Sequence, residues 1–293
     1  METLYHYCSS STFLSILRKK AIQLSSLSLS NDLMEGKVLS DVFSRIIEKD
    51  SFDDESATLL RNVLCIMERF FDGLGFCLSE VGDLLSQWRG YAQDGQGFCI
   101  GFSKKYLEDL SKNQRVSILE ESRFVLRKVI YDKLEQERAL TPIYHKIKEM
   151  SDAGKLKFPR PPGLLTRCLS ETSEEDYEQR KNEYFNNSLK VFFEIFPSLD
   201  NLFVFKNEAF SEEKEWRLVS FLLREKDDDC LFHASNNRLI PYRTFDLLPL
   251  DIQPITEIII GPKNITPLFV VEKLLNQQDL NKVPIRRSSA TYR

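Results

Sequence analysis

Short alternating runs of apolar and polar residues at both ends of the chain enclose a middle section with helical periodicity. Residues 4–10 predict an aromatic strand. The sequence STFLSILRKK (11–20) carries a helical apolar stripe and a basic end that suits the helix dipole, with Ser10 or Ser11 as N-cap. Residues 21–32 predict a strand or extended edge, and residues 37–72 predict helix.

The next part of the chain places a polar segment between two strands. Strands are predicted at 75–80 and 97–103, and VGDLLSQWRGYA (81–92) between them reads as a short helix or a loop. An amphipathic helix at 104–123 and a strand at 124–132 follow. Residues 133–200 have helical periodicity, interrupted by FPRPPG, whose prolines must break a helix.

Strand character returns in the last third of the chain. It is found in residues 202–223, 238–250 and 255–263, and again in 282–293, after a helix at 265–278 with Asn264 or Thr266 as its cap. Strands therefore cluster at both ends of the chain. We predict one α+β domain over residues 1–293, with a mixed, largely antiparallel sheet gathered from N- and C-terminal segments and a helical insertion at 133–200.

Composition excludes several classes of protein. A net charge of −4 argues against a general phosphate-neutralising nucleic-acid binder, although it leaves room for a local basic patch. The six cysteines form no C-x-x-C pair and there are only three histidines, so we expect reduced thiols and no metal site. No signal pattern and no membrane-length apolar run is present. We predict a cytoplasmic protein without membrane contact and leave its oligomeric state open.

The first polar interruption of the strand pattern is His6, between Tyr5 and Tyr7. His6 is either a satisfied half-buried residue or a neutral imidazole that donates to a ligand hydroxyl. Ser9 lies at the start of the following helix, where backbone N–H groups can face an anion.

A second interruption, Asn31-Asp32 with Glu35 before Gly36, either forms a turn for local reasons or contacts a ligand.

The third interruption is the segment that contains Arg89 and Tyr91. The planar guanidinium of Arg89 suits a phosphate or carboxylate, although Arg89 could equally pair with an acidic neighbour, Glu80 or Asp83. Trp88 is expected to pack in the core, and the following DGQG is expected to form a turn between strands.

The fourth interruption is FSEEKEWRLVS. On a strand, Glu213, Glu215 and Arg217 share one face. One carboxylate can then hold a hydroxyl while the other stabilises developing positive charge. The alternative is a solvated strand face with cross-strand salt bridges.

In their order and rough spacing, these segments resemble the bacterial domain-of-unknown-function family 2971 almost end to end. The resemblance rests on LYHYCSSSTFLSIL, LSLSNDLMEG, CLSEVGDLLSQWRGYAQDGQGFCIGF, FKNEAFSEEKEWRLVS, LIPY and ITEIIIGPK. The family usually has threonine where this chain has Cys8.

The opening YHYCSSSTFLSIL is also similar to the start of ADP-ribosyltransferase-like folds, including enzymes that modify DNA bases. This similarity implies an NAD-dependent transferase that acts on nucleic acid or protein, with a role as a toxin or defence effector. It implies catalytic roles for Glu215, Glu213 and His6, with Tyr91 stacking on nicotinamide. The expected NAD contacts are His6, Tyr7, Ser9, Asn31, Arg89 and Tyr91.

Two other functions fit the same residues. One is a module that binds a nucleotide or a partner without turnover. The other is a metal-dependent nuclease-like effector that uses the paired glutamates as ligands. If the transferase interpretation holds, His6, Arg89 and Glu215 should line one cleft.

Overall fold

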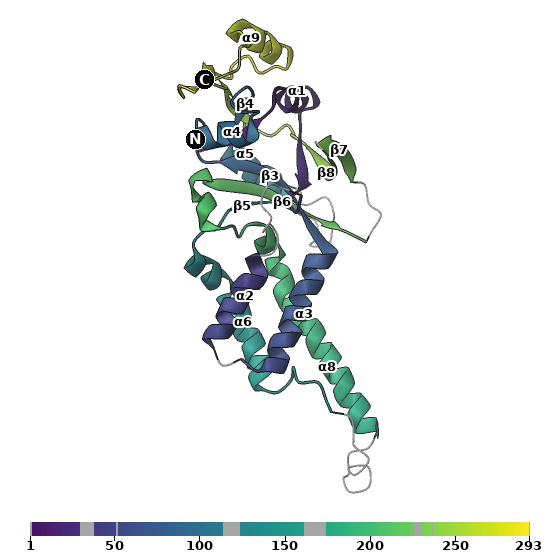
Figure 1. The fold of residues 1–293 in the computed structure, drawn as a ribbon. Coiled ribbons are helices and arrows are strands. Elements are labelled where there is room, and N and C mark those ends of the chain that lie inside the picture. The colour runs from purple at the N-terminus through teal and green to yellow at the C-terminus, as the bar shows by residue number, and fades with distance from the viewer. Residues whose placement is uncertain are drawn as a thin grey trace. The chain divides into compact units, whose positions relative to one another are not determined.

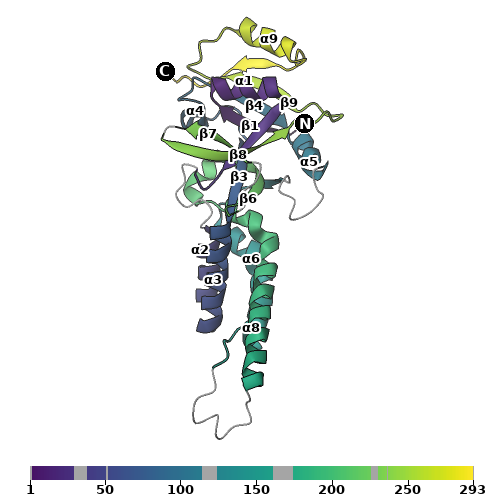
Figure 2. The same ribbon diagram turned by 90° about the vertical axis from the view of Figure 1, so that its right-hand side faces the viewer.

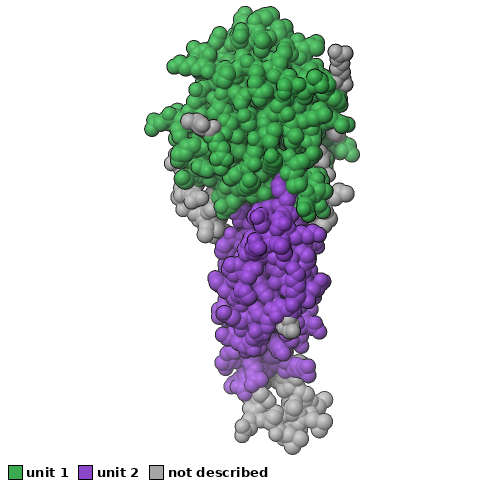
Figure 3. Space-filling model, turned by 90° about the vertical axis from the view of Figure 1, so that its left-hand side faces the viewer, with its two compact units in different colours: residues 1–33, 72–129, 206–293 green, residues 34–71, 130–205 purple. Residues whose placement is uncertain are grey.

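The computed structural model describes residues 2–29, 38–50, 52–113, 124–160, 174–225, 230–235 and 237–292. The chain forms two compact units, coloured green and purple in Figure 3. Unit 1 comprises Met1–Leu33, Asp72–Val129 and Lys206–Arg293, and unit 2 comprises Met34–Phe71 and Ile130–Phe205. Residues 133–200 thus lie within unit 2, together with an earlier helical segment.

The sheet is built from strands at both ends of the chain, as the alternating pattern predicted. In the described residues its strands are β1 (Thr3–Cys8), β2 (Ala21–Ser26), β3 (Phe71–Ser79), β4 (Phe98–Ser103), β5 (Val125–Lys128), β6 (Glu215–Leu223), β7 (Leu231–Ser235), β8 (Arg238–Asp246), β9 (Ile255–Ile260) and β10 (Ile285–Arg287). Their order is β10-β9-β4-β1-β3-β2-β8-β7, while β6 pairs with β3 and β5.

The sheet is mixed and mostly antiparallel, which confirms the predicted fold class. β1 is antiparallel to both its neighbours, β3 and β4, whereas β9 and β10 are parallel. β1 therefore lies inside the sheet, and both of its edges are hydrogen-bonded. This position fixes the backbone of His6, which is paired with Ile100 of β4.

Unit 1 contains the helices predicted near the N-terminus, after β4 and near the C-terminus, and two shorter ones. They are α1 (Ser10–Lys19), α4 (Leu85–Tyr91), α5 (Lys104–Asn113), α9 (Leu268–Gln277) and the 3₁₀ helix η2 (Glu208–Glu213). α1 buries Phe13, Ile16 and Leu17, and the Phe13 ring stacks on Phe98 of β4. The cap of α1 is Ser9, not Ser10 or Ser11, since the Ser9 side chain accepts a hydrogen bond from the Thr12 N–H.

Unit 2 is helical. Its described elements are α2 (Val38–Lys49), α3 (Asp54–Phe70), α6 (Lys133–Asp152), α8 (Glu174–Ile195) and the 3₁₀ helix η1 (Phe196–Phe203). The four α-helices run side by side in Figures 1 and 2, and each of α2, α3 and α6 contributes apolar residues to the interior of the unit. The helical prediction for 37–72 is confirmed for α2 and α3, while Phe71 and Asp72 already belong to β3. The prediction for 133–200 is confirmed for α6 and α8, and residues 161–173 between them lie outside the described ones.

The structure corrects two predicted strands. Residues 202–214 contain 3₁₀ helices instead of a strand, because Asn207 caps η2 and Lys214 adopts a left-handed conformation (φ 44°) just before β6. The C-terminal strand is limited to β10, because Ser288 and Ser289 turn to hydrogen-bond with Asp83. The predicted helix 104–123 is confirmed as α5 up to Asn113, and its last residues lie outside the described ones.

The DGQG segment is a tight turn, as expected. Asp94 and Gly95 both have positive φ, of 55° and 86°. Gly97 lies so close to β1 that a Cβ atom there would be 2.1 Å from the Cys8 carbonyl oxygen. The glycines therefore allow close backbone packing, and Trp88, which has no exposed surface, packs edge-on against Tyr7 beside them.

Replacing Gly97 with alanine should lower the free energy of unfolding by at least about 2 kcal/mol, because its new methyl group would overlap backbone atoms that cannot rotate away. The matched control is Gly90→Ala in α4, where a Cβ meets nothing within 4 Å. It should be neutral or should stabilise the protein by about 0.5–1 kcal/mol. Urea unfolding of both variants tests this, and equal stabilities would contradict the proposed close packing.

Candidate functional site

Residues from four distant segments of unit 1 line one small cavity of about 50 Å³. β1, β3, α4 and the junction of η2 with β6 contribute them. The lining residues are His6, Tyr7, Cys77, Leu78, Gln87, Tyr91, Glu213 and Glu215. Five of these eight residues were predicted as site residues from the sequence.

The tautomer of His6 follows from its hydrogen bond. Its Nδ1 lies 2.8 Å from the Cys77 carbonyl oxygen, which can only accept, so Nδ1 carries the proton. Burial lowers the pKa of His6 to about 4, and the ring stacks on Phe76 at 4.0 Å between centroids. His6 is therefore neutral near pH 7 and its Nε2 is an acceptor. The expectation that His6 donates to a ligand is thus wrong: a ligand must donate to it.

Tyr7 holds the backbone rather than offering its hydroxyl to the cavity. Its hydroxyl donates to the Val81 carbonyl oxygen at 2.7 Å and accepts from the Leu84 N–H at 2.8 Å. These two bonds fix the loop that leads into α4. Tyr7 therefore fixes the start of α4, the helix that carries Gln87 and Tyr91.

Two glutamates and two cations form a buried cluster beside the cavity. Glu215 accepts hydrogen bonds from Arg217 Nε at 2.7 Å, Arg217 Nη2 at 2.9 Å and Lys206 Nζ at 3.0 Å. Glu213 accepts from Lys206 Nζ at 2.6 Å and from the Tyr91 hydroxyl at 3.1 Å. All four charged side chains are buried, and their formal charges cancel.

The electrostatics of the cluster keep Glu215 ionised. Burial by itself would raise the pKa of Glu215, but the charges and hydrogen bonds of Arg217 and Lys206 outweigh it and lower the pKa to about 2. The pKa of Lys206 is raised because Glu215 and Glu213 outweigh its own burial. The cluster is therefore a set of fixed charges at neutral pH.

The chain turn at Lys214 brings Glu213 beside Glu215. Although Glu213 precedes β6, the left-handed Lys214 directs it toward the same cavity. Ser79 Oγ donates to the Glu213 carbonyl oxygen at 2.7 Å, and the Glu80 N–H donates to the Lys214 carbonyl oxygen at 3.0 Å. The end of β3 thus holds both glutamates in place.

Helix geometry separates Arg89 from the other predicted residues. Gln87 and Tyr91, four residues apart in α4, share a face and line the cavity. Arg89 is two residues from each, faces away, and is exposed, with its guanidinium carbon 5.8 Å from the centre of the Tyr292 ring. The structure therefore brings together His6 and Glu215 but not Arg89, whose predicted phosphate contact stays a prediction.

The remaining predicted contacts fall elsewhere. Ser9 caps α1 and is not among the lining residues. Asn31, with Asp32 and Glu35, lies outside the described residues. Asp83 does not pair with Arg89: it accepts hydrogen bonds from Trp88 Nε1 and from Ser288 and Ser289, and so anchors the C-terminal segment to the start of α4.

The polar residues Gln87, Cys77 and Lys206, which line or neighbour the cavity, were not among the site residues predicted from the sequence. Gln87 had a detectable signal, because it lies four residues before Tyr91. Lys206 ends the apolar run LFVF, which is an unusual place for a solvated lysine. Cys77 offered no signal, since its position beside Glu215 depends on how β3 pairs with β6.

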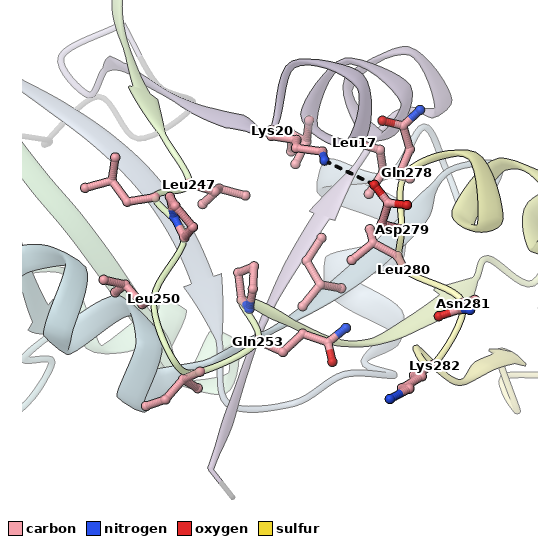
Figure 4. A pocket seen from close by; sticks show the side chains of 16 residues that line it. Leu17, Lys20, Leu247, Leu250, Gln253, Gln278, Asp279, Leu280, Asn281 and Lys282 are labelled. Carbon is pink, nitrogen blue, oxygen red and sulfur yellow. Dashed lines mark ion pairs between the residues drawn. The ribbon is translucent and has the colours of Figure 1, made fainter.

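A larger cavity of about 720 Å³ lies elsewhere in unit 1, between the end of α1 and two loops, 247–255 and 278–282 (Figure 4). Its walls are mainly apolar, with an ion pair of 3.8 Å between Lys20 and Asp279 at one edge. None of the predicted site residues lines it. The small cavity, where the ionisable groups and the histidine converge, is therefore the better candidate for chemistry.

Neither a metal cluster nor a membrane span is found in the described part of the chain. Within it, no group of three or more His, Cys, Asp or Glu residues is arranged to hold a metal ion. Among its helices, none combines the length and the apolar character needed to cross a bilayer.

The comparison with protein families assigns part of the chain. Residues 87–218 match DUF2971. That family is described as a protein of unknown function. The match includes Gln87, Tyr91, Glu213 and Glu215 but excludes His6, and it covers less than half of the chain, so the nearly end-to-end resemblance expected from the sequence is confirmed only for this part. No curated protein and no solved structure matches, and the resemblance to ADP-ribosyltransferases has no support from these comparisons.

Removing Lys206 should strongly destabilise unit 1. Lys206→Ala leaves Glu213 without its cation and weakens the compensation of Glu215, which should cost about 3–5 kcal/mol. Lys128→Ala, which breaks a pair with Glu80 in which the lysine is about half exposed, is the control and should cost less than about 1 kcal/mol. Chemical denaturation measures both, and similar losses would show that the buried cluster is not a tightly coupled unit.

Acid should destabilise the protein in two steps. Because the folded pKa of His6 is near 4 and its ordinary value is 6.5, the unfolded chain binds that proton more readily, and stability falls as pH drops from about 6.5 to 4. The depressed pKa of Glu215 gives stability that is present above about pH 4.5 and is lost as the pH falls toward 2.

The free energy of unfolding in urea, measured as a function of pH, should show the first step in the parent and not in His6→Gln. Imidazole ¹⁵N shifts should show a protonated Nδ1, and titration of His6 near pH 6.5 would contradict the lowered pKa.

Proposed function

We propose that this chain is an NAD-dependent ADP-ribosyltransferase-like enzyme that modifies a nucleic acid or protein, as a toxin or defence effector. One observation carries the proposal: His6 of β1, Tyr91 of α4 and the Glu213–Glu215 pair line a single cavity although they are far apart in sequence. The sequence resemblance expects His6, Arg89 and Glu215 in one cleft. His6 and Glu215 line this cavity together with Tyr91, whereas Arg89 does not, so the proposal rests on the histidine, the aromatic ring and the carboxylate without the predicted arginine.

The reaction places distinct demands on these groups. The glycosidic C–N bond between ribose and nicotinamide breaks, its electron pair leaves on the nicotinamide nitrogen, and the sugar becomes oxocarbenium-like. A nucleophile of the target then bonds to the anomeric carbon and loses its proton. Glu215, ionised because its pKa is about 2, can stabilise the developing positive charge. Nε2 of His6 can accept a hydrogen bond from a ribose hydroxyl.

The size of the cavity sets where the ligand lies. About 50 Å³ is far below the roughly 300–1,000 Å³ of a pocket that encloses a whole small-molecule ligand. Only small substituents of a dinucleotide can enter, and its rings must lie at the mouth. Tyr91 is 41% exposed there, so its ring can stack on nicotinamide, as the sequence resemblance implies.

One observation favours a second function, binding of NAD or another nucleotide without turnover. The charge of Glu215 is already offset by Arg217 and Lys206, and a compensated carboxylate stabilises an oxocarbenium-like sugar less than a free one does. The same contacts weaken the nuclease alternative, because a divalent metal would have to displace two cations from the glutamates.

Nicotinamide release tests the transferase. The protein is incubated with NAD and either nucleic acid or a cell lysate, and the parent should release nicotinamide. Glu215→Gln, which preserves side-chain size, should reduce the rate at least about 100-fold because the negative charge beside the sugar is lost. Glu212→Gln is the matched control, since Glu212 is exposed and lies one residue from Glu213. Circular dichroism and thermal melting of each variant establish that it is folded.

The other outcomes separate the alternatives. Saturable NAD binding without release would favour the binding module. Cleavage of nucleic acid that requires magnesium or manganese would favour the nuclease. Absence of both NAD binding and nicotinamide release would overturn the proposed function.

A further inference from the structure

Most polar groups around the small cavity already have partners. The Tyr7 hydroxyl bonds to backbone, the Tyr91 hydroxyl bonds to Glu213, and both glutamates bond to the buried cations. Two groups have no hydrogen-bond partner among the residues that the structure describes. They are the side-chain amide of Gln87 and the Nε2 atom of His6.

Gln87 is more than nine-tenths buried, with 8% of its surface exposed. Its amide can donate two hydrogen bonds and accept others, and its nitrogen and oxygen are not among the fully buried side-chain atoms that lack a partner. The amide therefore reaches the space of the cavity that Gln87 lines. An amide that reaches the cavity and has no partner among the described residues is available to a ligand group there.

The charges in the cavity define the chemistry of that group. Lys206 and Arg217 are engaged by Glu213 and Glu215, so they do not present an uncompensated positive charge to the cavity. A phosphate or carboxylate entering it would lie beside the two glutamates and opposite the lone pair of His6. The group that enters is therefore neutral and carries both a donor and an acceptor.

We propose that Gln87 is the specificity-determining residue of a carboxamide subsite, which receives the carboxamide of the nicotinamide ring. The inference rests on the proposed function, because that function supplies the ligand. The Gln87 N–H donates to the ligand carbonyl oxygen, and its Oε1 accepts from the ligand N–H. A carboxamide is small enough for the cavity, while the ring lies at the mouth against Tyr91 and a ribose hydroxyl donates to His6.

This pairing predicts discrimination between an amide and an acid. Nicotinic acid has the same ring, but its ionised carboxylate cannot donate to Gln87 Oε1 and adds a negative charge near Glu213. The parent should bind NAD at least about 10-fold more tightly than the dinucleotide that carries nicotinic acid in its place. Isothermal titration calorimetry measures both dissociation constants.

Gln87→Leu should reduce that ratio to near one while the protein keeps its fold. Because the amide makes no hydrogen bond within the described residues, its replacement by leucine should leave the melting temperature nearly unchanged. Gln253→Leu is the matched control: Gln253 is exposed and lies in unit 1 outside the small cavity, so its ratio should equal that of the parent. Unchanged discrimination in Gln87→Leu, with NAD still bound or consumed, would overturn the carboxamide subsite and leave the proposed function standing.

A second measurement tests the carboxamide subsite independently of the proposed transferase activity. Free nicotinamide and nicotinic acid are titrated separately while the Gln87 side-chain amide resonance, identified by its loss in Gln87→Leu, is followed by ¹⁵N NMR. A saturable shift with nicotinamide alone supports the subsite even if the chain releases no nicotinamide from NAD. No shift with nicotinamide, or equal shifts with both compounds, overturns it.

Discussion

The buried cluster of Lys206, Glu213, Glu215 and Arg217 is the interaction on which the candidate site depends. Each charge by itself would be costly to bury, and the cluster is tolerable only because every charge meets an opposite one at hydrogen-bond distance. The cluster therefore requires that the segment before η2 and the start of β6 stay together. Ser79 and Glu80 at the end of β3 hold the turn between them.

This constraint also decides what the cavity can recognise. Because the cations are engaged by the glutamates, the cavity presents neutral hydrogen-bonding groups instead of an anion site. His6 supplies an acceptor, Nε2, because its protonated Nδ1 donates to the Cys77 carbonyl oxygen. Gln87 supplies a donor and an acceptor. The cluster thus provides one ionised carboxylate for chemistry and leaves recognition to uncharged side chains.

Several parts of the site could be predicted because they depend on short-range geometry. The period of two in a strand placed Arg217 on the face of Glu215, and the aromatic strand at the N-terminus identified His6 and Tyr7. The direction of the Arg89 side chain was harder to predict, because residues 81–92 fitted either a helix or a loop. Once they form α4, the helical period separates Arg89 from Gln87 and Tyr91. Lys206 and Cys77 depend on strand pairing, which local periodicity does not encode.

The sequence by itself determined the fold class, the positions of most helices and strands, and the shared strand face of Glu215 and Arg217, because alternation and helical periodicity are properties of neighbouring residues. Tertiary structure alone decided that the turn at Lys214 brings Glu213 beside Glu215, that Lys206 pairs with both glutamates, that His6 accepts instead of donating, and that Gln87 has no partner among the described residues. These properties depend on how segments far apart in the sequence pack together, such as the segments that carry His6 and Glu215, which line one cavity. Burial and hydrogen-bond partners at such separations are set by the packed chain.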